Sequence, residues 1–284
     1  MNNNLTEKAM LIRLSISQWT ARKYDPKVTA EIIKSHNADP DSGRFNKMLV
    51  DLDCVKVYQK IAGESRTFHY SNTLSWGDDD SRILPAANYL PYTNKMREFA
   101  ARFEGAVRDF IGLYPSLIDR AKNSLNGLFD PKDYPAPAEL AGKYGFKVVV
   151  SPLPDAADFR VTLGQAEVDR IRDEIQETVK ASIQGAIKDL WARLHSVVRH
   201  LADKLKDKDA IFRDSLINNI RELTDLLPRL NIVNDSDLNA MVDEVKRDLA
   251  GQNPETLRDD KYARFQAAAD AEKIIKKMAA YMGS

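Results

Sequence analysis

A long stretch without a proline, from residue 164 to about residue 206, constrains this chain more than any other feature. Its apolar residues recur every three or four positions, the spacing that places side chains on one face of an α-helix. At a rise of 1.5 Å per residue, this helix would be roughly 60 Å long. Other helices must cover its apolar face, so the sequence predicts a mainly α-helical fold of long antiparallel, coiled-coil-like helices. The apolar positions are Val168, Ile171, Ile175, Val179, Ile183, Ile187, Leu190, Leu194, Val197, Leu201 and Leu205.

The composition is that of an ordinary folded, helical protein. Of the 284 residues, 43% are hydrophobic and 30% are charged, which is too apolar for a disordered chain. The 42 basic and 42 acidic side chains cancel, so the whole chain has no long-range attraction to nucleic acid or anionic lipid. The single cysteine, Cys54, excludes an internal disulfide framework and suits a reducing compartment.

No segment predicts insertion into a membrane or secretion. No run approaches the ~18 apolar residues of a membrane span, and the N-terminus lacks the apolar centre of a signal peptide. We therefore expect a soluble protein of the cytoplasm that does not contact membranes.

Residues suited to catalysis or metal binding do not form a recognisable set. His195 and His200 are five positions apart, so they do not share a helix face as metal-binding pairs do. There is no glycine-rich phosphate loop and no Gly-x-Ser-x-Gly motif, and Cys54 lies among apolar residues typical of a core. Three aspartates at 78–80 could collect a divalent cation, although a solvated acidic turn is the simpler explanation. We predict no metal site, no cofactor, no catalytic residue and no enzymatic activity.

Three segments have the pattern of β-strands. Residues 11–19 alternate between apolar and polar side chains, and 146–151 and 159–163 flank a proline-containing link. Three strands are the minimum for a stable sheet, so we expect a small three-stranded sheet at one end of the long helices. This predicts N-terminal helices and the sheet in 1–163, and the long helix with a C-terminal helical bundle in 164–284, joined as one continuous elongated unit.

A β-hairpin between two long helices also occurs in helical pore-forming toxins. A membrane-inserting tongue would be a nearly continuous apolar run, whereas Lys147, Asp155, Asp158 and Arg160 interrupt this one. The charges therefore favour a sheet within the fold over a tongue.

Prolines and capping residues predict where other helices begin and end. Asp25 followed by Pro26 is a typical helix start. Pro115 predicts a kink or break in a helix that begins at Thr93, and Pro228 predicts the end of another. Further helices are expected from Phe45 and from Asn253, the second running to about Met282.

The segment 66–92 has no sustained periodicity and is rich in aromatic and hydrogen-bonding side chains. Long irregular connections in compact proteins are often functional. Rigid apolar surface with polar tips is also the composition that binding surfaces favour. We predict a binding loop here, and the alternative is a loop that merely fastens itself to the helices. The candidate residues are His69, Asn72, Trp76, Asn88 and Tyr89.

The long helix has an acidic beginning and a basic end. This polarity agrees with the helix dipole and needs no ligand to explain it. It also permits a phosphate-binding patch, which makes nucleic-acid binding the alternative function. The candidate residues for that function are Arg193, Arg199, Lys204 and Lys206.

Four segments give the chain a resemblance to a known group of sequences. They are 68–77 (FHYSNTLSWG), 84–89 (LPAANY), 155–161 (DAADFRV) and 211–216 (IFRDSL). With these segments the chain resembles an uncharacterised family, a domain of unknown function encoded by tailed phages and related prophages. Genes of that family tend to lie near a MoxR-type AAA+ ATPase. The resemblance implies a phage-encoded accessory protein in the bacterial cytoplasm, and it carries over no catalytic residue.

Together these observations predict a non-enzymatic helical interaction, adaptor or assembly protein, and the resemblance implies that it is phage-encoded and accessory to an AAA+ ATPase. The long amphipathic helix also predicts a homo-oligomer, because one chain has few elements with which to cover it.

Overall fold

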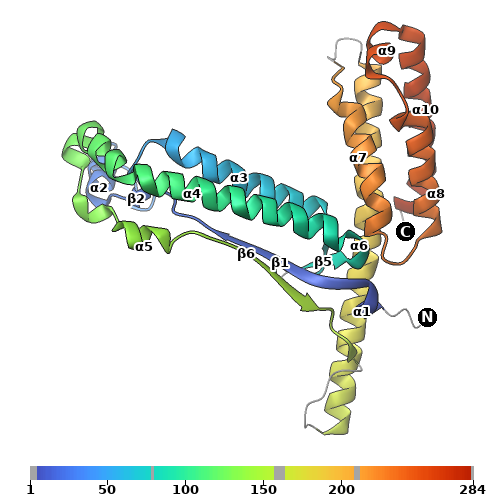
Figure 1. The fold of residues 1–284 in the computed structure, drawn as a ribbon, viewed down its shortest axis with the longest axis horizontal. Helices are drawn as coiled ribbons and strands as arrows, with labels where there is room; N and C mark the ends of the chain where they lie inside the picture. The colour runs from blue at the N-terminus through green and yellow to red at the C-terminus, as the bar shows by residue number, and fades with distance from the viewer. Residues whose placement is uncertain (1–4, 78–79, 157–163, 208–211, 283–284) are drawn as a thin grey trace. The chain divides into compact units, whose positions relative to one another are not determined.

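The computed structural model describes residues 5–77, 80–156, 164–207 and 212–282 (Figure 1). In these ranges α-helices dominate, and the strands form two small sheets. The prediction of a mainly helical fold with long helices and a small sheet is confirmed, whereas the coiled-coil character of the helices stays a prediction. Within the described ranges, no helix is both long enough and apolar enough to cross a bilayer.

The chain divides into two compact units, each assembled from segments that are distant in sequence. Unit 1 contains Met1–Arg13, Tyr70–Tyr92 and Val149–Ser284, and unit 2 contains Leu14–His69 and Thr93–Val148. Both units draw on residues before position 163. The division of the chain into 1–163 and 164–284 stays a prediction.

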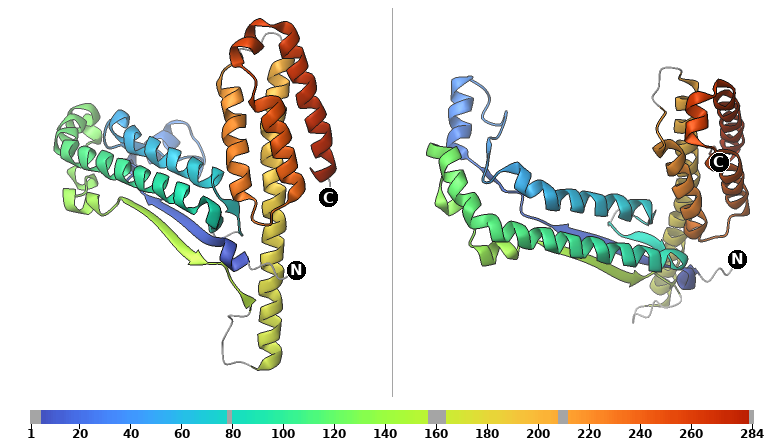
Figure 2. Two further views of the ribbon diagram at one scale, coloured as in Figure 1. Left: turned by 45° about the vertical axis from the view of Figure 1, so that its right-hand side comes forward. Right: turned by 45° about the horizontal axis from the view of Figure 1, so that its top comes forward.

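The centre of unit 1 is a four-helix bundle, in which α7, α8 and α10 pack against the second half of α6 (Figures 1 and 2). Helix α10 runs antiparallel to α6: Arg264 reaches backbone carbonyls at the end of α6, and the ring of Tyr281 stacks on Trp191, 4.4 Å between centroids. The helical elements are α6 Gln165–Lys206, α7 Ser215–Leu230, α8 Ser236–Val245, the π-helical turn η5 Lys246–Ala250, α9 Pro254–Asp259 and α10 Lys261–Met282.

The apolar stripe of α6 is buried unevenly. From Ala186 onward the helix is covered by α7, α8 and α10. The first half extends beyond these three helices (Figure 1), and its apolar residues Ile171, Ile175 and Val179 are only half-buried. Ile183 and Ile187, which follow in the same stripe, are also half-buried and pack against the core of the bundle. The fully buried residues of the second half are Ala186, Leu190, Trp191, Leu194, Val198, Leu201, Ala202 and Leu205.

The larger sheet has four strands in the order β4-β5-β1-β6, and a separate pair joins β2 and β3. The strand predictions at 11–19 and 146–151 are confirmed by β1 and β6, whereas 159–163 lies outside the described residues. A sheet of three strands was wrong, because β4 and β5 are too short to show alternation in the sequence and form by antiparallel pairing with each other and with β1. The strands are β1 Ala9–Ser17, β2 Arg22–Tyr24, β3 Asn46–Met48, β4 Leu74–Ser75, β5 Arg82–Pro85 and β6 Gly145–Pro152.

Unit 2 is organised around aromatic residues between α3 and α4. The Tyr58 ring lies 5.4 Å from that of Phe110, edge to face, and its hydroxyl donates to the carbonyl oxygen of Trp19 at 3.0 Å. Tyr114 packs edge-on to Trp19 at 5.7 Å. The elements that contribute to this unit include α2 Pro26–Ser35, α3 Leu52–Ser71, α4 Tyr89–Leu125, η2 Asn126–Leu128, η3 Pro131–Asp133 and α5 Pro137–Ala141. The chain also contains α1 Leu5–Lys8 and η1 Ala86–Asn88.

Several predicted helix boundaries need correction. Asp25 caps α2 as expected, accepting hydrogen bonds from the backbone of Lys27 and Val28. Helix α3 begins at Leu52 and not at Phe45, because the intervening residues pair as β3.

Proline positions were the least reliable of the boundary signals. Helix α4 continues through Pro115, where the buried side chains of Tyr114 and Leu117 anchor it, and α7 continues past Pro228. The last helix is divided at Asp260, whose carboxylate accepts hydrogen bonds from the backbone of Tyr262 (2.8 Å) and caps α10.

Candidate interaction surface

In its described residues, the segment 66–92 consists mostly of helix and strand, and not of the irregular loop that the sequence predicts. It contains the end of α3, strands β4 and β5, η1 and the beginning of α4. His69 and Asn88 are buried, with 3% and 0% of their surface exposed, so neither is available to a partner. The side-chain amide of Asn88 donates to the carbonyl oxygen of Asn72 at 3.0 Å. Asn72, Trp76 and Tyr89 are half-buried.

Of these candidates, Trp76 lines a groove on the first half of α6. The groove has a volume of about 240 Å³. Its apolar wall comes from the half-buried side chains of Ile171, Ile175 and Val179, and Glu174 and Thr178 add exposed polar atoms. We call this surface the Trp76 groove; its described lining is Trp76, Pro154, Ile171, Glu174, Ile175, Thr178 and Val179.

Two interactions hold Trp76 at the groove. The hydroxyl of Ser182 donates to the carbonyl oxygen of Trp76 at 2.7 Å and fastens the turn to α6. The Trp76 side chain also packs against the core of the bundle. One wall of the groove is therefore the apolar stripe of α6, and the other is an aromatic side chain on a turn whose backbone is bonded to a helix hydroxyl.

Arg193, a candidate for nucleic-acid contact, organises the turn that precedes Trp76. Its guanidinium donates to the carbonyl oxygens of Ser71 (2.7 Å), Tyr70 (3.2 Å) and Thr73 (2.8 Å), and it pairs with Asp189 at 2.7 Å. These carbonyls lie at and just beyond the end of α3, where helical partners are lacking. Arg193 thus caps α3 and joins it to α6.

The other basic candidates lie where α6 meets α10. Arg199 and Lys206 are exposed, Lys204 is half-buried, and Lys206 pairs with Glu272 of α10. The hydrogen bond from Lys206, with the charges of Lys206, Lys276 and Arg199, lowers the pKa of the Glu272 carboxyl against the opposing effect of burial. Several cations therefore surround one carboxylate.

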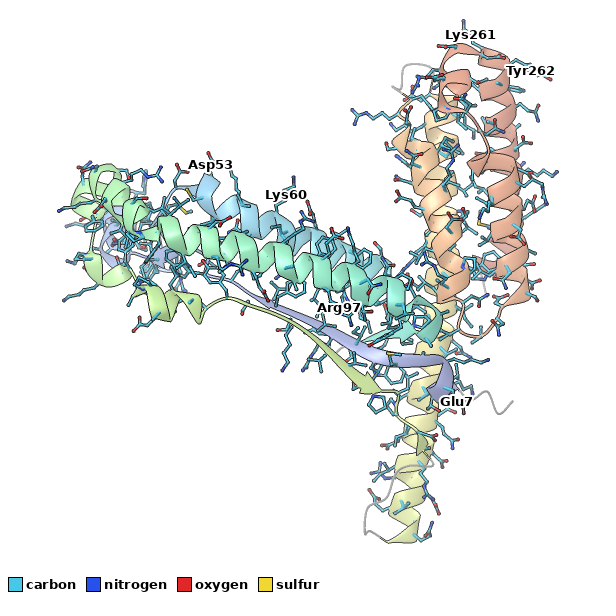
Figure 3. All side chains as sticks on the ribbon, in the orientation of Figure 1. Glu7, Asp53, Lys60, Arg97, Lys261 and Tyr262 are labelled. Carbon is cyan, nitrogen blue, oxygen red and sulfur yellow. The ribbon has the colours of Figure 1, made fainter. Side chains whose placement is uncertain are left out.

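The outward face of α10 is a second surface that sequence reasoning missed. Tyr262 and Phe265 are 75% and 70% exposed and lie one helical turn apart. Figure 3 shows Lys261 and Tyr262 at the exposed beginning of the helix. Farther along, a groove of about 550 Å³ is lined by Ala269, Glu272, Lys273, Lys276 and Lys277. We define the α10 face as the residues on the side of Tyr262 and Phe265, namely Tyr262, Phe265, Ala269, Lys273 and Lys276.

The chemistry of the Trp76 groove suits recognition better than catalysis. Its polar side chains are one carboxylate and one hydroxyl, and Glu174 is already paired with Arg170. The groove is also smaller than the roughly 300–1,000 Å³ of sites that enclose small-molecule ligands. Among the described residues, no three His, Cys, Asp or Glu side chains are placed to hold a metal ion. Asp78 and Asp79 lie outside the described residues.

Comparison with protein-family models, with curated proteins and with solved structures finds no match for this chain. The site is therefore interpreted from its own geometry.

Proposed function

We propose that this chain is a non-enzymatic interaction protein, of the adaptor or assembly type, whose Trp76 groove receives an apolar side chain from a protein partner. The observation that carries the proposal is the incomplete burial of the apolar stripe of α6. Ile171, Ile175 and Val179 continue that stripe beyond the bundle and meet an aromatic side chain. Contiguous apolar surface bordered by polar residues is typical of protein-binding sites.

The family resemblance, which includes segments 68–77 and 84–89, supports a particular origin and partner for the protein. It suggests a phage-encoded protein of the bacterial cytoplasm and an AAA+ ATPase as a partner. Segment 68–77 contains Trp76, so the groove and the resemblance involve the same turn.

Site-specific photocrosslinking in cell extract tests the groove. A photoreactive residue at Thr178, which lines the groove, should form crosslinks to protein. The matched control is Lys180, two positions along the same helix and therefore on its opposite side, where the crosslinks should be absent. Equal crosslinking at both positions, or none at Thr178, would contradict the proposal.

The second candidate function is nucleic-acid binding, favoured by the cations of Arg199, Lys206 and Lys276 around Glu272. Binding through this cluster should weaken steeply with salt. Replacing Arg199 or Lys276 by Gln should reduce the slope of log affinity against log salt by about one unit. Lys180→Gln is the control at a distance from the cluster. Absence of a mobility shift with single- and double-stranded DNA and RNA at low salt would exclude this function.

A further inference from the structure

We propose that the partner in the Trp76 groove is the α10 face of a second copy of this chain. This inference rests on the proposed function of the groove and adds the identity of its occupant. Four observations support it: the exposure of Tyr262 and Phe265, the separation of the two surfaces, their opposite charges, and the small side chain at the centre of the α10 face.

Tyr262 and Phe265 are the most exposed large hydrophobic side chains in the described part of the chain. They are neighbours on the helix, because residues three positions apart lie on the same side. Aromatic pairs of this kind contribute large apolar area at little cost in side-chain entropy, and such residues commonly anchor protein interfaces. The Trp76 groove, about 240 Å³ and apolar, has the size and chemistry for such an anchor.

The two surfaces cannot meet within one molecule. Arg264, between Tyr262 and Phe265, donates hydrogen bonds to the carbonyl oxygens of Lys204 and Leu205, which fixes the beginning of α10 at the end of α6. The groove lies near Thr178 on the same helix. The 28 residues between Thr178 and Lys206 correspond to roughly 42 Å of helix. Contact between the surfaces therefore requires a second copy.

The surfaces carry opposite charge. Along α6, residues 165–181 contain five acidic and three basic side chains, whereas residues 261–277 of α10 contain five basic and two acidic side chains. Lys273 and Lys276 are exposed on the α10 face, and residues 165–181 keep an excess of two carboxylates even though Glu174 pairs with Arg170. Complementary charge favours encounter and fixes the register of the two helices.

Ala269 separates the aromatic and basic parts of the α10 face. It is exposed and has the smallest side chain on that face, so another helix can approach closely there. With the aromatic pair in the groove, Lys273 and Lys276 lie roughly 12 and 16 Å beyond Phe265 along the helix axis, about the distance from Ile175 to the beginning of α6. One helix can therefore satisfy both parts of the contact.

The proposed contact joins different surfaces on the two copies. After one contact has formed, one copy keeps a free α10 face and the other copy keeps a free groove. Such head-to-tail contacts produce closed rings or open filaments and not simple two-fold dimers.

Two complementary variants test the inference by sedimentation velocity over a wide concentration range. Ile175→Glu places a charge in the groove, and Phe265→Glu removes the aromatic anchor. Wild type should form species larger than dimers, and each variant should weaken association by about tenfold or more. A mixture of the two variants retains one intact groove and one intact α10 face, so it should form dimers that do not grow further.

The control is Val57→Glu on α3, where the valine is 57% exposed and belongs to unit 2. It should assemble as wild type does, and circular dichroism melts should show all three variants folded. A strictly monomeric wild type, unchanged assembly of Phe265→Glu, or a mixture that stays monomeric would overturn the inference. A monomeric wild type that still crosslinks to another protein at Thr178 would leave the proposed function intact.

Discussion

At the scale of single residues, Arg193 stabilises the fold by bonding to three backbone carbonyls near the end of α3. We expect Arg193→Met to lower the free energy of unfolding by about 2–3 kcal/mol, because it removes charge-assisted hydrogen bonds to the carbonyl oxygens of Ser71 and Thr73. Urea denaturation measures the change. Arg199→Met, two turns along on the exposed surface, is the control and should change stability by less than about 0.5 kcal/mol. Similar losses for both variants would show that Arg193 does not act as a cap.

A second residue-scale prediction concerns pH and the buried Lys47, which contacts Asp133 at 2.7 Å and Asp25 at 3.5 Å. Burial alone would lower the pKa of Lys47, but the hydrogen bond and charge of Asp133, with a smaller contribution from Asp25, outweigh burial and raise it. The backbone N–H of Val28 and the charge of Lys47 lower the pKa of Asp25 against burial.

The lowered pKa of Asp25 makes the stability of the fold depend on pH. Because the pKa in the folded protein lies below the ordinary value of 3.8, the contribution of Asp25 to stability is complete above that pH and is lost as the pH falls through the folded pKa. Asp25→Asn should therefore be less stable than wild type at neutral pH, and the difference should shrink below about pH 4. Denaturation at a series of acidic pH values tests this. A difference that is constant down to the lowest pH would contradict it.

At the scale of elements, Pro115 lies inside the continuous helix α4. Proline removes one backbone hydrogen bond and crowds the preceding turn. We expect Pro115→Ala to raise the free energy of unfolding by about 1–2 kcal/mol, because the regained helix energy exceeds the entropy that the unfolded chain gains. Pro228→Ala, within the last turn of α7, is the matched comparison and should have a smaller effect. A thermal melt that shows Pro115→Ala to be destabilising would mean that the proline relieves strain in α4.

How well the elements could be predicted depended on the length of the pattern. The stripe of α6 repeats over many turns, so its bounds followed from the sequence almost to the residue. β4 has two residues and forms only because β5 lies beside it, a contact that no local pattern encodes. The composition of segment 66–92 identified Trp76 as a candidate. The apolar residues of α6 that line the groove with it, Ile171, Ile175 and Val179, were expected to be covered by other helices. The sequence does not show that α7, α8 and α10 leave the first half of α6 uncovered.

The α10 face could not be predicted from the sequence for a different reason. Its lysines and aromatic residues are visible in the sequence, but the division of the last helix at Asp260 is not. Without that division the exposed side of Tyr262 and Phe265 cannot be assigned. Sequence reasoning therefore identified the groove by one residue and overlooked the surface that we propose to occupy it.

At the scale of the whole molecule, unit 1 draws core residues from three segments. The buried cluster around α6 includes Leu11, Leu74 and Ile83, although most of its members lie within 164–284. We expect the isolated fragment 164–284 to keep its helical bundle, because α6, α7, α8 and α10 bury each other's apolar faces. The first half of α6 should fray in that fragment, since Ser182 loses its bond to Trp76 and the groove loses one wall.

Hydrogen exchange distinguishes these two parts of the fragment. Amides from Ala186 to Leu205 should stay protected, whereas those from 165 to 182 should exchange much faster than in the full chain. The fragment keeps the α10 face but not the groove, so it should not assemble alone and should shorten the assemblies of the full chain by occupying their grooves. Uniform loss of protection would show that unit 1 folds only with its N-terminal segments. A fragment that assembles by itself would show that residues beyond the Trp76 groove carry the contact.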